Sequence, residues 1–140
     1  MSSGVDKTAE FTVRIDAARD DLIALTQDLI RIPTLNPPGN NYLEICEYLA
    51  RRMTKRGFEV EMIRAYGTPG DSDKYPRWNV VARREGAHPG ECVHFNSHID
   101  VVEVGQGWTF DPFGAELSDG KIYGRGSCDI SGVRPHLIRS

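Results

Sequence analysis

The sequence predicts an α/β fold in which a mixed sheet is flanked by helices. Its first part carries apolar residues spaced three and four apart, the pattern of amphipathic helices. From residue 58 onward, short runs alternate apolar and polar residues, which is typical of strands with one solvated face. Clusters of Gly, Pro, Asn and Asp separate these runs, so we expect one domain with loops at the strand ends.

Two helices open the predicted fold. Residues 13–32 form one apolar stripe that Pro33 ends, and a loop over residues 34–41 follows. Asn41 with Glu44 resembles a capping pair, and it starts a second helix that ends at Gly57. The chain therefore begins as a helical hairpin.

Strands are predicted over residues 58–64, 78–82 and 92–97. A hairpin is predicted from residues 113–117 and 121–123, with Asp119 and Gly120 at a turn that requires positive φ. A further helix is implied toward the C-terminus. Ligands of such sheets bind beyond the carboxyl ends of strands, so residues that leave the strands are the candidates for function.

Composition narrows the class of partner and the compartment. The net charge of −3 provides no basic field for nucleic acid or anionic lipid. No apolar run reaches the roughly 18 residues of a membrane span, and the first ten residues lack a signal-peptide pattern. Three cysteines at irregular spacing fit a reducing compartment, so we expect a cytoplasmic protein. We expect Cys46 and Cys92 to be small buried hydrophobes.

His98 and Asp100 stand two residues apart at the end of a predicted strand, so both side chains face the same way. Their Cα atoms would lie about 6 to 7 Å apart, close enough for the carboxylate to orient an imidazole that holds a metal. The alternative is an ordinary electrostatic pair at a strand end.

Asp129 follows the glycine-rich turn at residues 124–126. A carboxylate there can bridge two metal ions about 3.5 to 4 Å apart, as a dinuclear hydrolytic site requires. An aspartate in this position is also a good helix N-cap, and that interpretation stays open.

Together these segments resemble the M20 family of metallopeptidases and amidohydrolases. The family shows a strand-end S-x-H-x-D-V-V, then W-x-x-x-P-F, a D-G-x-x-Y-G-R-G hairpin and a metal-bridging aspartate. The chain has the same order, with matching residues at Ser97, His98, Asp100, Val101, Val102, Trp108, Pro112, Phe113, Asp119, Gly120, Tyr123, Gly124, Arg125, Gly126 and Asp129. The Asn36-Pro37-Pro38-Gly39 loop is similar to the branch of acetylornithine deacetylases and succinyl-diaminopimelate desuccinylases.

The resemblance implies a role for each candidate residue. His98 would bind one zinc ion, Asp100 would act in catalysis by orienting the His98 ring, and Asp129 would bridge two zinc ions. Cobalt or manganese would suit the same ligands. The implied substrate is an N-acyl amino acid or a small peptide, and many family members dimerise through a second, lid-like domain. Cys128 is best interpreted as a small filler in the turn, His88 as a surface residue and His94 as a core or edge residue.

The resemblance ends after Asp129. Residues 130–140 lack the family's lysine and second glycine, and Pro135 fits poorly in a helix. We therefore expect residues 1–129 to be the N-terminal part of a catalytic domain and residues 130–140 to be an aberrant tail, produced by a frameshift or premature stop. The lid domain, a Glu-Glu pair with the general base and a distant histidine ligand are not in the sequence. We expect weak metal binding and no turnover.

Two other functions are compatible with the sequence. One is a non-catalytic truncated module that binds or interferes with an intact homologue. The other is an unrelated metallohydrolase, in which the matches at Trp108 and at residues 124–126 would be chance.

Overall fold

The computed structural model describes residues 7–88, 90–128 and 134–138, with side chains for residues 8–88 and 90–128. It has the α/β composition that the sequence predicts. In chain order the elements are α1 (Lys7–Ala17), α2 (Arg19–Ile30), α3 (Tyr42–Lys55), β1 (Glu59–Arg64), β2 (Trp78–Arg83), β3 (Cys92–Asn96), β4 (Glu116–Ser118), β5 (Lys121–Tyr123) and β6 (Arg134–Ile138). In the part of the chain so described, no helix is long and apolar enough to cross a bilayer.

The first helical stripe is divided in two, contrary to the prediction of one helix over residues 13–32. Ala18 leaves the helical conformation (φ −93°, ψ 1°) between α1 and α2. The apolar residues of α1, including Val13 and Ile15, are 68% and 60% exposed. Because these apolar side chains are exposed, packing does not hold α1 as a rigid extension of α2.

Helix α3 begins and ends close to the predicted residues. Asn41 is its N-cap, but its side chain makes no capping hydrogen bond and donates instead to the Pro33 carbonyl (3.0 Å). The predicted capping pair with Glu44 is therefore wrong, because Asn41 takes a left-handed conformation (φ 57°). Gly57, with φ of 81°, follows the helix as a C-terminal glycine.

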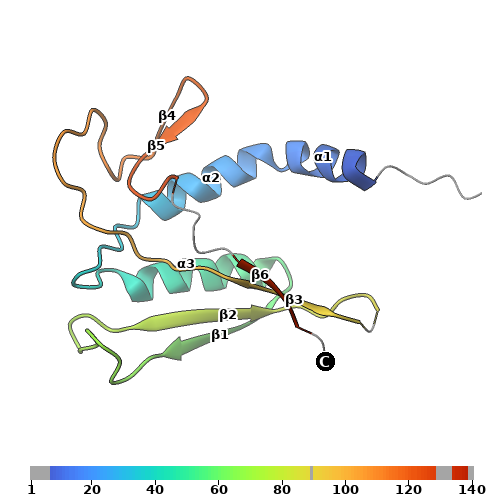
Figure 1. The fold of residues 1–140 in the computed structure, drawn as a ribbon, viewed down its shortest axis with the longest axis horizontal. Coiled ribbons are helices and arrows are strands. Elements are labelled where there is room, and N and C mark those ends of the chain that lie inside the picture. Colours follow the sequence, from blue (N-terminus) through green and yellow to red (C-terminus); the bar gives the residue numbers. More distant parts are fainter. Residues whose placement is uncertain (1–6, 89, 129–133, 139–140) are drawn as a thin grey trace, which may run out of the picture.

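The described strands pair in three two-stranded antiparallel sheets, β1–β2, β3–β6 and β4–β5. Helix α3 packs against β1 and β2, while α1 and α2 run nearly in line on the other side of α3 (Figure 1). One isolated parallel bridge joins Leu35 to Val101, so both directions of pairing occur. Asp119 (φ 48°) and Gly120 (φ 72°) make the predicted tight turn between β4 and β5.

The prediction of a helix toward the C-terminus is wrong for Arg134–Ile138. These residues form strand β6, which pairs with β3. Pro135 explains part of the difference, since it disfavours a helix and is tolerated at the edge of a sheet.

The buried core of the described residues is small, and it lies where α2, α3 and the loops after them meet. It comprises Ile30, Thr34, Tyr42, Ile45, Cys46 and Ala115. Cys46 is fully buried, as predicted, and burial raises the pKa of its thiol to about 11. Cys92 is exposed, so the prediction of a buried Cys92 is wrong; every residue of β3 is exposed.

The β4–β5 hairpin returns to this core through Gly124. A Cβ atom at Gly124 would lie 2.5 Å from Ile30 Cγ2 and 3.2 Å from the Pro112 carbonyl oxygen. Position 124 requires glycine because Ile30 and the Pro112 carbonyl occupy the space that a side chain would need.

We expect Gly124→Ala to destabilise the chain by about 1 to 3 kcal/mol, the usual effect of overpacking. Urea unfolding would measure it as a lower midpoint. Gly86→Ala is the matched control, because the nearest atom to a Cβ there is 3.6 Å away and its φ is ordinary. Equal midpoints for the two variants would contradict the packing argument.

Candidate functional site

His98 and Asp100 lie together just after β3, as their spacing predicts. His98 Nδ1 is 3.2 Å from Asp100 Oδ1 and 2.9 Å from the Asp100 backbone oxygen. Both partners of Nδ1 are acceptors, so Nδ1 carries the proton of a neutral ring. Nε2, on the other side of the ring, is then the nitrogen suited to a metal.

A neutral donor holds the Asp100 carboxylate in place. Asn36 Nδ2 donates to Asp100 Oδ2 (2.7 Å), and the nearby Tyr42 hydroxyl helps to lower the pKa of this carboxylate. Burial alone would raise the pKa of Asp100, but these two groups and the nearby His98 outweigh it and lower the pKa. Asp100 is therefore an anion at neutral pH, as an orienting partner of an imidazole must be.

The charge of Asp100 also affects the pKa of Tyr42. Burial and the negative charge of Asp100 raise the pKa of Tyr42 to about 12. The phenol thus keeps its proton and stays a donor.

The backbone around Asp100 is aligned by the segment that follows α2. Asn36 N donates to Val101 O (2.9 Å), and Val101 N donates to Thr34 O (3.0 Å). The Thr34 hydroxyl, 2% exposed as a residue, donates to the Ile99 carbonyl (2.6 Å). These three bonds set residues 34–36 beside residues 99–101 and so place Asn36 against Asp100.

The glycine-rich turn meets the same region from the other side. Arg125 Nη2 donates to the carbonyls of Glu103 (2.9 Å) and Val104 (3.0 Å), and its guanidinium lies 5.1 Å from the Trp108 ring centroid. A Cβ at Gly126 would approach Val101 Cγ1 to 2.8 Å. The two segments that carry the predicted site residues are therefore in contact.

The predicted metal ligands are described only in part. His98 is in place with its orienting carboxylate, whereas Asp129 lies outside the described residues. Across residues 7–88, 90–128 and 134–138, no group of three or more His, Cys, Asp or Glu side chains could hold a metal. The imidazole and its carboxylate fit one corner of a zinc site, and further ligands would be needed to close it.

A cavity of about 470 Å³ opens beside this pair. Its wall includes His98, Asp100 and Arg125, and most of the remainder is apolar, with Leu29, Ile45 and Phe113 among the lining residues. Such a mixture of apolar wall and a few polar groups is typical of small-molecule sites.

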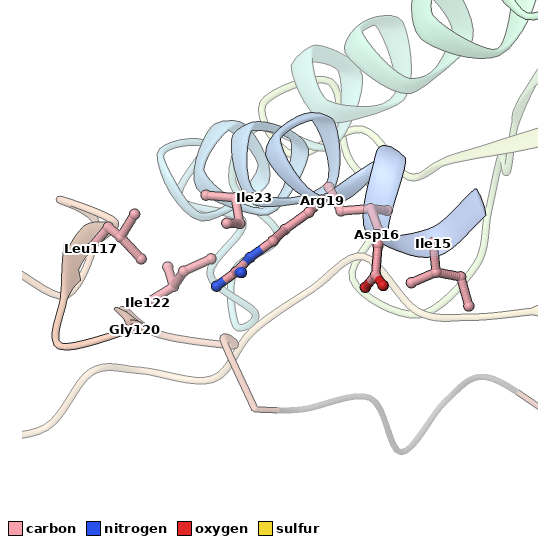
Figure 2. Close-up of a pocket in the computed structure, with 8 residues that line it drawn as sticks. Ile15, Asp16, Arg19, Ile23, Leu117, Gly120 and Ile122 are labelled. Carbon is pink, nitrogen blue, oxygen red and sulfur yellow. The ribbon is translucent and has the colours of Figure 1, made fainter. Parts of the chain in front are cut away.

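A second hollow, of about 370 Å³, lies between the first two helices and the β4–β5 hairpin. Figure 2 shows Arg19 extending toward Ile122 and Asp16 beside Ile15, with the apolar side chains of Ile23 and Leu117 around them. Neither His98 nor Asp100 lines it. The predicted site residues that the structure describes therefore line the first cavity and not this hollow.

Sequence reasoning did not assign Asn36, Thr34 or Tyr42 to the site. Asn36 was expected only as a loop residue, although an amide beside two prolines and a glycine is a signal of a shaped loop. His88 is exposed, as predicted. His94 is exposed on β3, so the core alternative for it is wrong and the edge alternative holds.

The sequence is similar to known proteins over about four fifths of the chain. The model of Peptidase family M20/M25/M40 matches residues 94–133, which include His98, Asp100 and Arg125. A succinyl-diaminopimelate desuccinylase of Cereibacter sphaeroides is 40% identical over 116 residues, 81% of this chain and 27% of that protein.

Relatives from other organisms align over the same part of the chain. Succinyl-diaminopimelate desuccinylase 2 of Ruegeria sp. is 38% identical over 81% of this chain and 26% of its own length. The enzyme of Parvibaculum lavamentivorans is 39% identical over 79% of this chain and 26% of its own length. The chain thus spans about a quarter of the length of these relatives, and it belongs to peptidase family M20/M25/M40.

Proposed function

We propose that this chain supplies the histidine and carboxylate half of a zinc site in a hydrolase that cleaves the amide bond of an N-acyl amino acid or small peptide, of the desuccinylase type. The observation that carries the proposal is the His98 Nδ1 contact with Asp100, at 3.2 Å to the carboxylate and 2.9 Å to the backbone oxygen. The relatives named as desuccinylases support the substrate class.

In this proposal each residue of the chain has a limited task. Asp100 holds the His98 ring with Nδ1 protonated, so that Nε2 takes one metal ion. Zinc, when bound, would lower the pKa of a water molecule and polarise the amide carbonyl. The chain itself orients the imidazole, keeps Asp100 ionised, and offers an apolar wall beside both groups.

Asp129 completes the proposal as the carboxylate that bridges two metal ions. Gly126 lies against Val101, so the turn that precedes Asp129 in the sequence contacts the segment that carries Asp100. The Arg125 contacts with the carbonyls of Glu103 and Val104 support this, because they hold the turn beside the segment that follows Asp100.

The 140 residues contain no Glu-Glu pair to provide a general base. We therefore propose that the chain alone is inactive. Incubation of the purified chain with zinc and succinyl-diaminopimelate should release no succinate. Succinate release that His98→Ala abolishes would show that the chain is a complete catalyst. Co-purification with an intact desuccinylase would instead support the alternative of a non-catalytic module.

Zinc should bind first at His98. We expect zinc to shift the imidazole signals of His98 in ¹H–¹⁵N NMR spectra while leaving those of exposed His88 unchanged. His98→Ala should remove the zinc-dependent shift. His94 is exposed on β3, so His94→Gln serves as the control for zinc captured at that histidine. A response confined to His94 would contradict the proposed site.

Loss of the orienting carboxylate should weaken that binding. Asp100→Asn is expected to lower zinc affinity at His98 about 10- to 100-fold, since an amide neither carries the charge nor fixes the tautomer as firmly. The same zinc titration measures the change. Asp119→Asn, in the exposed turn between β4 and β5, makes the same chemical substitution away from the site and should leave the affinity unchanged. Equal affinities for Asp100→Asn and the unsubstituted chain would refute the orienting role.

A further inference from the structure

Arg77 reaches the loop that supports Asp100. It directly precedes β2, and its Nη2 donates to the Pro38 carbonyl (3.0 Å) and, at a longer 3.4 Å, to Asn36 Oδ1. A Cβ at Gly39 or Gly70 would overlap the guanidinium. Both glycines therefore leave the space that the Arg77 guanidinium occupies, and a side chain at either position would displace it.

The guanidinium determines which way the Asn36 amide faces. An arginine has only donors, so it can meet the oxygen of an amide but not its NH₂ group. With Oδ1 facing Arg77, Nδ2 faces Asp100 and donates to it at 2.7 Å. A reversed amide would place two donors against Arg77 and an oxygen against the carboxylate, and both contacts would be repulsive.

Arg77 also lies against Tyr42. Its guanidinium carbon is 4.9 Å from the centroid of the Tyr42 ring, within the range of a cation–π contact. The Tyr42 hydroxyl in turn helps to lower the pKa of Asp100. The two neutral groups that stabilise the carboxylate, Asn36 and Tyr42, therefore both contact one guanidinium.

Anchoring of the neighbouring loop does not account for this side chain. The loop before β2 is held by the ion pair of Arg64 with Asp71, and the hydrogen bonds of Arg77 to it come from its backbone: its N–H donates to Asp71 Oδ1 (3.1 Å), and its carbonyl accepts from Ala65 N (2.9 Å). Nε and Nη1 of Arg77 are buried without a hydrogen-bond partner among the described residues. Burying a charged group with two unsatisfied donors is costly. The contacts of Arg77 with Asn36 and Tyr42 therefore indicate a role beyond anchoring the loop.

We propose that Arg77 is a positioning residue of the His98–Asp100 site, which sets the Asn36 amide so that it donates to Asp100 and holds the Tyr42 ring beside that amide. Its effect on metal binding rests on the proposed function, whereas its effect on Asn36 does not. The two are measured separately.

The test uses Arg77→Met, which keeps an unbranched chain and removes the fork of donors. In the metal-free chain, the side-chain NH₂ signals of Asn36 should move, and their hydrogen exchange should accelerate about tenfold. Zinc affinity at His98 should fall about tenfold, the lower end of the effect of outer-shell partners.

Arg84→Met is the matched control. Arg84 also lies over an aromatic ring (Phe58, 5.8 Å) and donates to a backbone carbonyl (Arg56 O, 3.3 Å), but it touches no residue of the site. It should leave the Asn36 signals and zinc binding unchanged. Should Arg77→Met fail to fold, Arg77→Lys is read in the same way, because a lysine keeps the charge but cannot serve Pro38, Asn36 and Tyr42 together.

Unchanged Asn36 signals in a folded Arg77 variant would overturn the proposal, and so would equal changes in Arg84→Met. A chain that binds no zinc at His98 would overturn the proposed function alone, since the Asn36 signals would still report on Arg77.

Discussion

The parallel bridge between Leu35 and Val101 is the constraint on which the site depends. It joins the segment after α2 to the segment after β3, which lie more than sixty residues apart in the chain. Each of its hydrogen bonds contributes only about 0.5 to 1.5 kcal/mol, yet together with the Thr34 hydroxyl they fix the register of the two segments. A slip by one residue would turn Asp100 away from Asn36 and leave the carboxylate without the hydrogen bond from that amide.

The choice of neutral donors around Asp100 has an electrostatic consequence. A guanidinium paired directly with this carboxylate would draw its charge away from the imidazole. Asn36 and Tyr42 instead stabilise the anion by their dipoles. The Arg77 cation contacts these two residues. The negative charge is thus directed at His98 Nδ1, where it favours the tautomer that leaves Nε2 to accept a metal.

Local patterns in the sequence predicted much of the fold and the center of the site. Apolar spacing located α3, alternation located β1 and β2, and the Asp119-Gly120 pair located the hairpin turn, because each signal acts within a few residues. The His98 and Asp100 pair was also a local pattern. The roles of Asn36, Tyr42 and Arg77 could not be predicted in this way, since each depends on contacts between distant segments. Ala18 and Cys92 were predicted wrongly for a related reason: local pattern does not say whether an apolar residue finds a partner to cover it.

Cys46 gives the chain an internal reporter of its own opening. It lies on α3 and is fully buried, while Cys92 and Cys128 are exposed. Alkylating reagents attack the thiolate, which burial suppresses at position 46 by raising the pKa to about 11. Labelling should therefore be fast at two cysteines and slow at the third, where its rate reports how often the packing around α3 opens.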